Sequence, residues 1–374
     1  MLYCTNCLSM STRPNVKFTS SGMCPACSQF ESPSSIDWSL RLTELESIKK
    51  FGKAHSTSGY DCIIGVSGGK DSTVQALFVR DTLKMKPLLV SMNYPPQQIS
   101  ELGVRNLSNL IDLGFDCLSI NCSPVVWKGL MRSGFYKFGN WAKSTELALF
   151  SSVPRIAIAY QIPLIWWGEN ASVQLGDMNV EGDDPSDGNK LKYSNTLDGG
   201  NIDWLLQTGL RRNQILQFQY PSDQEILRAG IRVIFLGHFI KDFTIFSNGT
   251  RASLRGLTFK APSIMDADFW GTSMLDEDFF TVNMMIKWLK FGFGRANDNV
   301  NEEIRCGRLS REEAIKIVEK FDGVCSTQVI EKFCSYIEVT TEEFWRVVDT
   351  FVNYDLFERI ERGVYRRKFQ VGVN

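Results

Sequence analysis

The order of apolar and polar positions predicts strands that alternate with helices between residues 60 and 237. Short apolar runs of strand length are separated by longer amphipathic stretches, as in βαβ units with right-handed crossovers. The runs are apolar on both faces, which is typical of buried parallel strands. We therefore predict an α/β fold with a parallel sheet, with strands at DCIIGV, KPLLVSMN, FDCLSIN, PLIWWGEN and IRVIFLG and helices at KDSTVQALFVRDTL, ISELGVRNLSNLIDLG, PVVWKGLMRSGFYKF and STELALFSSVPRIAIAY.

Helical patterns also flank this region. A helix is predicted from about Asp37, and the GKAHSTSGY segment that follows it is predicted to be a loop. Near the other end of the chain, Ser310 and Glu313 have the spacing of a capping box, as do Thr340 and Glu343. The final third of the chain is therefore predicted to be helical. The apolar residues at roughly helical spacing in the first helix are Leu40, Leu42, Leu45 and Ile48.

Composition and charge are those of an ordinary globular protein. Hydrophobic residues make up 43% and charged residues 22% of the 374 residues. The longest apolar runs, PLIWWG and VIFLGHFI, are far shorter than the roughly 20 residues of a membrane helix. The start, MLYCTNC, has neither a basic nor an apolar leader pattern, so we expect a cytoplasmic protein. The net charge of -1 argues against nucleic acid as a partner, because such proteins usually carry a positive field.

Two cysteine pairs near the start predict a structural zinc site. Cys4 and Cys7 are followed by Cys24 and Cys27 in the pattern C-x2-C, x16, C-x2-C. Four thiolates complete the tetrahedral sphere of Zn²⁺ and leave no open catalytic position. The polar RPNVKF between the pairs would depend on the metal for folding free energy. The alternatives are unligated cysteines in an unfolded arm and a redox pair, which usually lies at a helix start beside a βαβ unit.

The run VSGGKDST, between the first predicted strand and its helix, has the character of an anion-binding turn. It fits neither the Walker A pattern nor the dinucleotide fingerprint G-x-G-x-x-G. Its glycines allow close backbone approach, and backbone N–H groups, a helix N-terminus, hydroxyls and a lysine converge on one anion. An aspartate there would repel phosphate unless a cation lay between them, which points to Mg²⁺. The predicted ligands are Ser67, Gly68, Gly69, Lys70, Asp71 and Ser72, with Asp71 on the metal.

The SGGKDS run after the first strand resembles the pyrophosphate loop of the PP-loop ATP pyrophosphatases. These enzymes cleave ATP between the α- and β-phosphates and adenylate a carbonyl oxygen; asparagine, NAD and GMP synthetases and tRNA thiolases are members. The resemblance implies the adenine nucleotide alpha hydrolase-like fold with ATP at residues 67–72. The alternative, a glycine turn without a ligand, gives no reason for such a run between a buried strand and a helix.

A wider pattern resembles one branch of this superfamily, the N-acetyl sugar amidotransferases of bacterial surface-polysaccharide pathways, such as those of lipopolysaccharide O-antigen and nonulosonic acids. The resemblance covers most of the chain. It implies an ATP-dependent amidine synthase that converts an acetamido group of a nucleotide-activated sugar to an acetamidino group, through an adenylated imidate, with release of AMP and pyrophosphate. The segments that carry it are the first C-x2-C, TRPNVKF, SGMCPAC followed by Glu31, SGGKDS, WWGENAS and KFGFGRANDNVNEEIRCGRLSREEA.

The same resemblance implies that ammonia comes from a separate glutaminase with a cyclase-like barrel subunit, similar to the subunits of imidazole glycerol phosphate synthase. The chain itself carries no glutaminase pattern. Position 2 is Leu2 rather than a cysteine nucleophile, and no G-x-C-x-G elbow is present. The two histidines are His55 and His238, and we interpret His238 as a packed core residue rather than a base.

These observations divide the chain into three predicted units. Residues 1–35 are the zinc-binding knuckle, residues 36–300 the PP-loop ATP pyrophosphatase or amidotransferase domain, and residues 301–374 a C-terminal helical region. Within the second unit, residues 171–225 shift toward Gly, Asp and Asn, as in EGDDPSDGN. Because loops of that length are uncommon and usually functional, this segment is predicted to be a substrate-specific insertion.

Further site residues are predicted at the carboxyl edge of the sheet, where open α/β sheets bind ligands. Glu169 and Asn170 follow the strand PLIWWG and can contact Mg²⁺ or the acetamido group; an exposed strand end is the alternative. Asn93, at the end of the second strand, is predicted to face the adenine. We predict Lys70, Asp71 and Glu169 as the catalytic residues.

Four basic residues are candidate substrate contacts. Lys290 and Arg295 flank two glycines in KFGFGR, which resembles a family signature, and this resemblance implies contact with phosphate. Arg211 and Arg212, in the predicted insertion, can clamp the diphosphate or a carboxylate of the sugar. The alternative for each pair is solvated surface charge.

Two other functions fit parts of the pattern. A tRNA thiolase also joins a zinc motif to SGGKDS, but it typically has further paired cysteines near the ATP site and a basic surface. A zinc-ribbon adaptor with a decayed nucleotide domain is the non-enzymatic alternative. The intact Ser67, Lys70 and Asp71 argue against decay.

Overall fold

The computed structural model describes residues 1–31, 34–182, 184–265 and 267–374. Two positions of the predicted knuckle unit, residues 1–35, and one position of the predicted EGDDPSDGN segment lie outside these ranges. None of the helices in the described ranges is both long and apolar enough to cross a bilayer.

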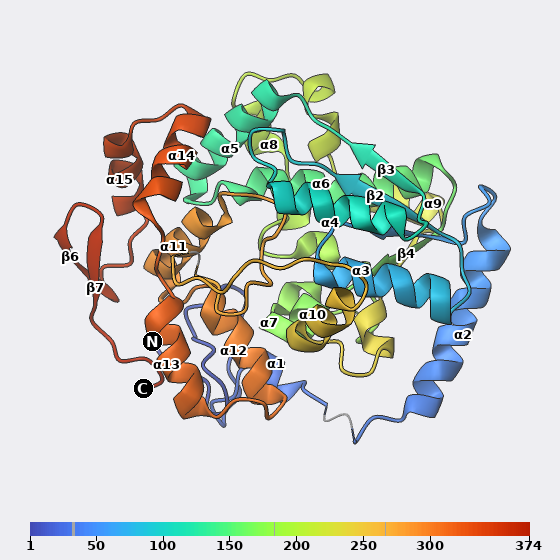
Figure 1. Ribbon diagram of the computed structural model, residues 1–374, viewed down its shortest axis with the longest axis horizontal. Helices are drawn as coiled ribbons and strands as arrows, with labels where there is room; N and C mark the ends of the chain where they lie inside the picture. The colour runs from blue at the N-terminus through green and yellow to red at the C-terminus, as the bar shows by residue number, and fades with distance from the viewer. Residues whose placement is uncertain (32–33, 183, 266) are drawn as a thin grey trace.

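A five-stranded parallel sheet forms the centre of the first three quarters of the chain (Figure 1). The strand order is β3-β2-β1-β4-β5, and every neighbouring pair is parallel. The predicted α/β class is therefore confirmed. The direction of the connections reverses between β1 and β4, which places a crevice at the carboxyl ends of these two strands. The strands are β1 (Cys62–Gly65), β2 (Pro87–Met92), β3 (Cys117–Ile120), β4 (Leu164–Trp167) and β5 (Arg232–Phe235).

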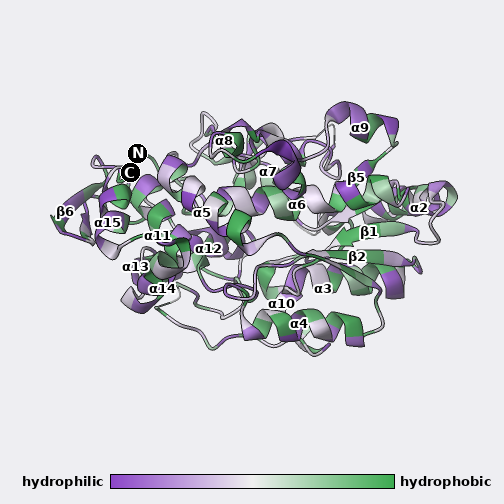
Figure 2. Ribbon diagram, turned by 90° about the horizontal axis from the view of Figure 1, so that it is seen from above, coloured by the Kyte–Doolittle hydropathy of each residue, from purple (hydrophilic) through white to green (hydrophobic). Residues whose placement is uncertain are grey.

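Both faces of the sheet are covered by helices, because each strand sends apolar side chains to both sides. In β1, Ile63 packs in the cluster that contains residues of α6 and α9, whereas Ile64 packs with α2, α3 and α4. Figure 2 shows α6 on one side of the strands and α3, α4 and α10 on the other. These helices are α2 (Trp38–His55), α3 (Lys70–Leu77, continued by a π-helical turn, Phe78–Thr82), α4 (Glu101–Asp112), α6 (Ala142–Ala159), α9 (Asp223–Arg228) and α10 (Ile245–Ser253).

Helix α2 differs from its predicted form in two respects. Asp37 caps it as expected, since its carboxylate accepts hydrogen bonds from the first turn. Its buried apolar side chains, however, are Leu45 and Ile48, whereas Leu40 and Leu42 are exposed. The helix also continues through GKAH to His55, where a loop was predicted. Gly52 allows this, because a Cβ there would lie 2.7 Å from the carbonyl oxygen of Asp61.

The C-terminal third is helical, as predicted, but ends in a β-hairpin that the pattern did not predict. The hairpin strands, β6 (Phe357–Glu361) and β7 (Val364–Arg367), are mostly exposed, so they lack the apolar run by which strands were recognised. The capping box of Ser310 and Glu313 is present. The helices are α11 (Phe280–Phe291), α12 (Arg295–Arg305), α13 (Arg311–Phe321), α14 (Thr327–Ile337) and α15 (Thr341–Asp349).

Helices α11, α14 and α15 share one core with α5 (Pro124–Phe138) and with part of the predicted insertion. The boundary predicted between residues 300 and 301 falls inside α12, and the division into three units stays a prediction. The predicted insertion folds into short helical turns. They are α7 (Ala171–Leu175), α8 (Asp203–Leu206) and the 3₁₀ turns Met178–Val180, Leu191–Tyr193, Asp198–Gly200, Arg212–Gln214 and Leu216–Phe218; α1 (Pro25–Ser28) and Leu236–Phe239 lie outside it.

Candidate functional site

The SGGKDS turn joins the end of β1 to the first turn of α3, as the sequence predicted. Gly68 has φ +80°, and a Cβ there would lie 2.8 Å from the backbone nitrogen of Leu107 on α4. Gly69 is the N-cap of α3, and its carbonyl accepts hydrogen bonds from the hydroxyls of Ser72 (3.1 Å) and Thr73 (2.9 Å). The first glycine is therefore required by packing against α4, whereas the second leaves the helix N-terminus open to an anion.

Lys70, Asp71 and Glu169 lie together at the crevice between β1 and β4. The Lys70 ammonium, 5% exposed, lies 2.8 Å from one carboxylate oxygen of Asp71. The other oxygen of Asp71 accepts a hydrogen bond from the Asn248 amide at 2.8 Å. Burial and the nearby charge of Asp71 raise the pKa of Glu169 to about 7, against the influence of Lys70. Two close carboxylates suit a divalent cation, which would relieve their repulsion.

Polar atoms without partners surround these carboxylates. The side-chain oxygen of Asn248 has no hydrogen-bond partner among the described residues, and neither does either amide atom of Asn299. Both side chains are almost fully buried. Glu302, on the same helix as Asn299, has a raised pKa because of burial and, in part, the charge of Asp71. Buried polar atoms of this kind are normally satisfied, so they fit a site that holds a polar ligand, a cation or water.

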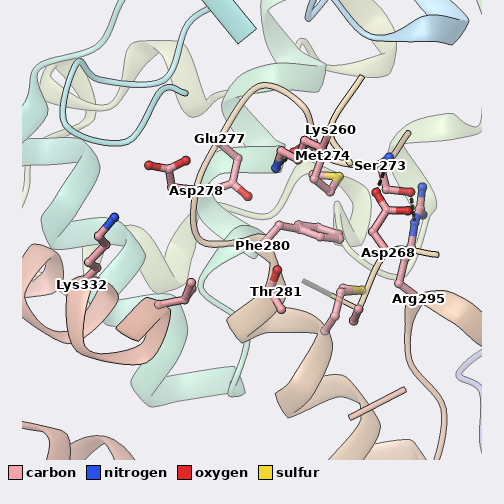
Figure 3. A pocket seen from close by; sticks show the side chains of 13 residues that line it. Lys260, Asp268, Ser273, Met274, Glu277, Asp278, Phe280, Thr281, Arg295 and Lys332 are labelled. Carbon is pink, nitrogen blue, oxygen red and sulfur yellow. Dashed lines mark hydrogen bonds between the residues drawn. The ribbon is translucent and has the colours of Figure 1, made fainter. Parts of the chain in front are cut away.

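The loop at residues 267–279, which carries Asp276, lies beside the SGGKDS turn. Ser67 donates a hydrogen bond to the buried Asp276 carboxylate, which opposes the rise of its pKa through burial. A cavity of about 260 Å³ lies beside this loop, and Arg295 lines it. Figure 3 shows Arg295 and Asp268 both bonded to Ser273, with Nε of Arg295 3.4 Å from the serine hydroxyl. Arg295 also acts electrostatically on Glu169, so it connects this cavity with the carboxylates.

The two predicted asparagines have local partners. Asn93 follows β2, and its side chain bonds to the Ser91 hydroxyl and to Asn121. Asn170 caps α7: its oxygen accepts from the backbone and hydroxyl of Ser172, and its amide donates to the Pro185 carbonyl. Their predicted contacts with adenine and substrate stay predictions, but the Asn170 side chain is largely occupied with capping.

Three of the predicted basic contacts lie away from the carboxylates. Lys290 donates to the Phe138 carbonyl at 2.6 Å, and burial, with Lys143 nearby, lowers its pKa to about 8. Arg211 and Arg212 are exposed. The next turn along the chain, Leu216–Phe218, packs against α6. Within the described chain, no hydrogen bond or ion pair connects these two arginines with the SGGKDS turn. Of the four basic residues, the structure brings Arg295 to the carboxylates.

The four predicted zinc ligands form one cluster. The sulfur atoms of Cys4, Cys7, Cys24 and Cys27 all lie within 4.8 Å of one another. Backbone N–H groups point at the sulfurs, for example those of Cys24 and Asn6 at Cys4 (3.2 and 3.4 Å). Such donors favour thiolates, the form that binds metal, so the residues fit a structural Zn²⁺.

The knuckle packs inward against the domain. Helix α1 lies against α7, the helix that directly follows Glu169 and Asn170. Leu8 is bonded through its backbone to two asparagines of α12: its N–H donates to Asn301 (2.7 Å) and its carbonyl accepts from Asn297 (2.9 Å). The zinc cluster therefore supports two of the elements that surround the site.

Several site residues carried no recognisable pattern in the sequence. Asn248 lies on α10, far along the chain from the turn that it contacts, and Asp276 lies in an irregular loop. Glu302 and Arg305 do fall within the NEEIRCGR segment that contributed to the family resemblance. That segment was the one signal in the sequence that could have located them.

Comparison with known protein families agrees with this geometry. The model of the family described as "LPS biosynthesis protein WbpG-like, C-terminal domain" matches residues 267–370. Over residues 267–370, the WbpG-like domain, the chain is similar to proteins of this description. The predicted resemblance to proteins of surface-polysaccharide biosynthesis is thereby confirmed. The WbpG-like domain begins in the loop that carries Asp276 and includes Arg295 and all of α12, so it contributes one wall of the site.

Two solved structures align with part of the chain. One is an NH3-dependent NAD synthetase from Campylobacter jejuni in complex with nitrate, 15% identical, covering 61% of this chain and 100% of that chain, with TM-score 0.31. The other is an NMN synthetase from Francisella tularensis, 16% identical, covering 63% and 100%, with TM-score 0.30. A comparison with curated proteins finds none that matches the chain.

The two glycines of the turn should respond differently to alanine. Gly68→Ala should lower the free energy of unfolding by about 2–4 kcal/mol, because it combines a positive φ with a clash against the α4 backbone. Gly69→Ala should cost under about 1 kcal/mol, since its Cβ would meet only the Ser67 hydroxyl, at 3.4 Å, but should weaken ATP binding. Urea denaturation and calorimetric titration with ATP measure the two effects. Equal stability losses in both variants would contradict this assignment.

Glu169 should make the metal-free protein less stable as the pH rises. Its pKa is about 7 in the native state and 4.5 when the group is unperturbed. Between these two pH values the native state binds more protons than the unfolded state, so the free energy of unfolding falls as the pH rises. Glu169→Gln removes this loss. We expect the variant to exceed the wild type by about 1–3 kcal/mol at pH 8 and by less at pH 5, measured by urea denaturation with chelator present. The exposed Glu331→Gln serves as control; the same pH trend in both variants would disprove the assignment.

Removal of a zinc ligand should destabilise the whole domain. Cys24→Ser should abolish stoichiometric zinc and lower stability by about 3 kcal/mol or more, because metal binding supplies folding free energy to the knuckle. Cys117→Ser, at a cysteine outside the cluster, should keep both the stoichiometric zinc and the stability of the wild type. Metal analysis and thermal unfolding with and without chelator provide the measurements, and a zinc-free wild type with unchanged stability would refute a structural metal.

Proposed function

We propose that the protein is an ATP-dependent amidotransferase that converts the acetamido group of a nucleotide-activated sugar to an acetamidino group. The observation that carries this proposal is the meeting of the SGGKDS turn and α3 N-terminus with Asp71 and Glu169 at the crevice between β1 and β4. The arrangement provides a phosphate cradle beside two carboxylates. The WbpG-like domain in its wall supports a substrate from lipopolysaccharide biosynthesis.

The proposed reaction has two steps. The amide oxygen of the acetamido group attacks the α-phosphorus of ATP, the bond to the β-phosphate oxygen breaks, and pyrophosphate leaves. The amide nitrogen gives up its proton, so the product is an O-adenylyl imidate. Ammonia then adds to the imidate carbon and AMP departs, which leaves the amidine. Activation is needed because the oxygen of an amide is otherwise a poor leaving group.

The residues of the site have distinct proposed roles. The backbone N–H groups at residues 67–72 and the α3 N-terminus hold the leaving phosphates, and Lys70 offsets the charge that develops there. Asp71, held by Lys70 and Asn248, would bind Mg²⁺, which neutralises phosphate charge when present. Glu169, with its raised pKa, would accept the proton of the amide nitrogen.

Ammonia is proposed to come from a separate glutaminase with a cyclase-like barrel subunit. This element of the proposal rests on the family resemblance and on the absence of a glutaminase pattern in the sequence. Free ammonium should therefore replace the partner in an assay of the isolated chain.

The test is incubation with ATP, Mg²⁺, ammonium and UDP- or CMP-activated N-acetyl sugars, followed by mass spectrometry of the sugar and measurement of AMP. The expected product has NH in place of the amide oxygen, with one AMP formed per amidine. Formation of ADP instead of AMP, or no AMP with any acetamido sugar, would overturn the proposed reaction.

Asp71→Asn should lower kcat by about 10²–10³-fold, because the amide removes the charge that holds the cation while keeping the hydrogen-bonding shape. Its stability should remain close to that of the wild type. Asp112→Asn, at an exposed residue of α4, is the matched control and should keep full activity. Full activity in Asp71→Asn at low Mg²⁺ would remove the role assigned to this carboxylate.

A further inference from the structure

A cavity of about 680 Å³ lies at the carboxyl ends of β4 and β5. Residues from several separate parts of the chain line it: 29–31 and 36–41, 168–174, 181–182 and 184–185, 237–244, and the end of α12 with the residues that follow it. A cavity of about 300–1,000 Å³ suits an organic ligand of drug size rather than an ion. None of the residues predicted to bind phosphate lines it, so it is separate from the SGGKDS turn.

Glu169 connects this cavity with the phosphate site. It lines the cavity, and its pKa responds to the charges of Asp71 and Lys70 on the other side. A molecule in the cavity and a nucleotide on the SGGKDS turn would thus meet at the same carboxylate. This is the relation that a two-substrate reaction requires, because the attacking oxygen must come close to the α-phosphorus.

One wall of the cavity offers an aromatic ring beside cations. Trp38, half-buried at the start of α2, lies with its ring 5.3 Å from the Arg41 guanidinium and 5.3 Å from the Lys241 ammonium. Phe30 and Phe243 add apolar surface. An aromatic side chain with cations this close to its ring is suited to lie against a nucleobase whose phosphates are near.

The arginines of the cavity differ in their partners. Arg308 pairs with Glu303 and Asp242, and Arg41 with Glu31. Arg305 donates one hydrogen bond to the Gln174 carbonyl at 2.8 Å. Among the described residues, it forms no ion pair. Its guanidinium therefore keeps donors for an anion. The carboxylates at the cavity, such as Glu181 and Asp184, offer acceptors for sugar hydroxyls.

From these contacts we propose that this cavity binds the nucleotide-activated acetamido sugar, with the base against Trp38, the diphosphate beside Arg41 and Arg305, and the acetamido group toward Glu169. The inference rests on the proposed function and adds the place and the contacts of the second substrate. It moves the sugar away from Arg211 and Arg212, which do not line the cavity.

The test separates the two substrates kinetically. Trp38→Ala should raise the KM for the nucleotide sugar about tenfold or more, as expected for a lost stacking contact, with the KM for ATP unchanged. Trp38→Phe should restore most of the affinity. Arg305→Gln should raise the same KM, and Arg305→Lys should recover part of it; the zinc content of each variant shows that the knuckle is intact. Arg228→Gln, at an exposed residue of α9, is the control.

Binding without turnover distinguishes the failure of this inference from that of the proposed function. Calorimetric titration with a UDP-activated N-acetyl sugar, with UDP alone and with the free sugar is performed on the wild type and on Trp38→Ala. If amidine forms but the cavity variants keep the wild-type KM for the sugar, the cavity assignment is wrong while the function stands. If no amidine forms but the wild type binds the nucleotide sugar and Trp38→Ala does not, the cavity assignment survives alone. If the cavity variants lost affinity for ammonium and kept their affinity for the sugar, the cavity assignment would be overturned.

Discussion

The reversal of the chain connections between β1 and β4 is the constraint on which the site depends. Crossovers leave these neighbouring strands in opposite directions, so the connecting segments leave a crevice beyond their carboxyl ends. The turn after β1 brings the N-terminus of α3 and Asp71 into this space, and the turn after β4 brings Glu169. The two carboxylates are forced together in a poorly solvated place, which raises the pKa of Glu169 and creates the affinity for positive charge.

Helix α12 joins this crevice to the rest of the molecule. Its residues are strongly polar, yet most are buried, and fixed partners compensate their charges. Burial alone would raise the pKa of Asp298. The charges of Arg13 and Lys287 instead hold this pKa well below its usual range. Such buried pairs determine position more than they add stability. They place Arg295 at one end of the helix, by the smaller cavity, and Arg305 at the other, by the larger one.

The zinc knuckle has a supporting part in this arrangement. It lies beneath α7 and α12, so the metal would stabilise two walls of the larger cavity rather than contact a substrate. Its effect on binding would act through the position of α7, the helix that directly follows Glu169 and Asn170. Loss of the metal would therefore reach the larger cavity through packing.

The sequence by itself determined the parallel sheet, the turn at residues 67–72 and the cysteine cluster, because each depends on residues close together in the chain: apolar runs, a glycine turn before a helix, and paired thiols. It did not determine which distant side chains complete the site. Asn248, Asp276 and Arg305 come from elements that only the folded chain brings to the crevice. The hairpin at the end was missed because its strands are polar, and the contacts predicted for Arg211 and Arg212 stay predictions because charge alone does not show where a loop packs. Those contacts depend on how helices and loops pack around the sheet, which tertiary structure alone decides.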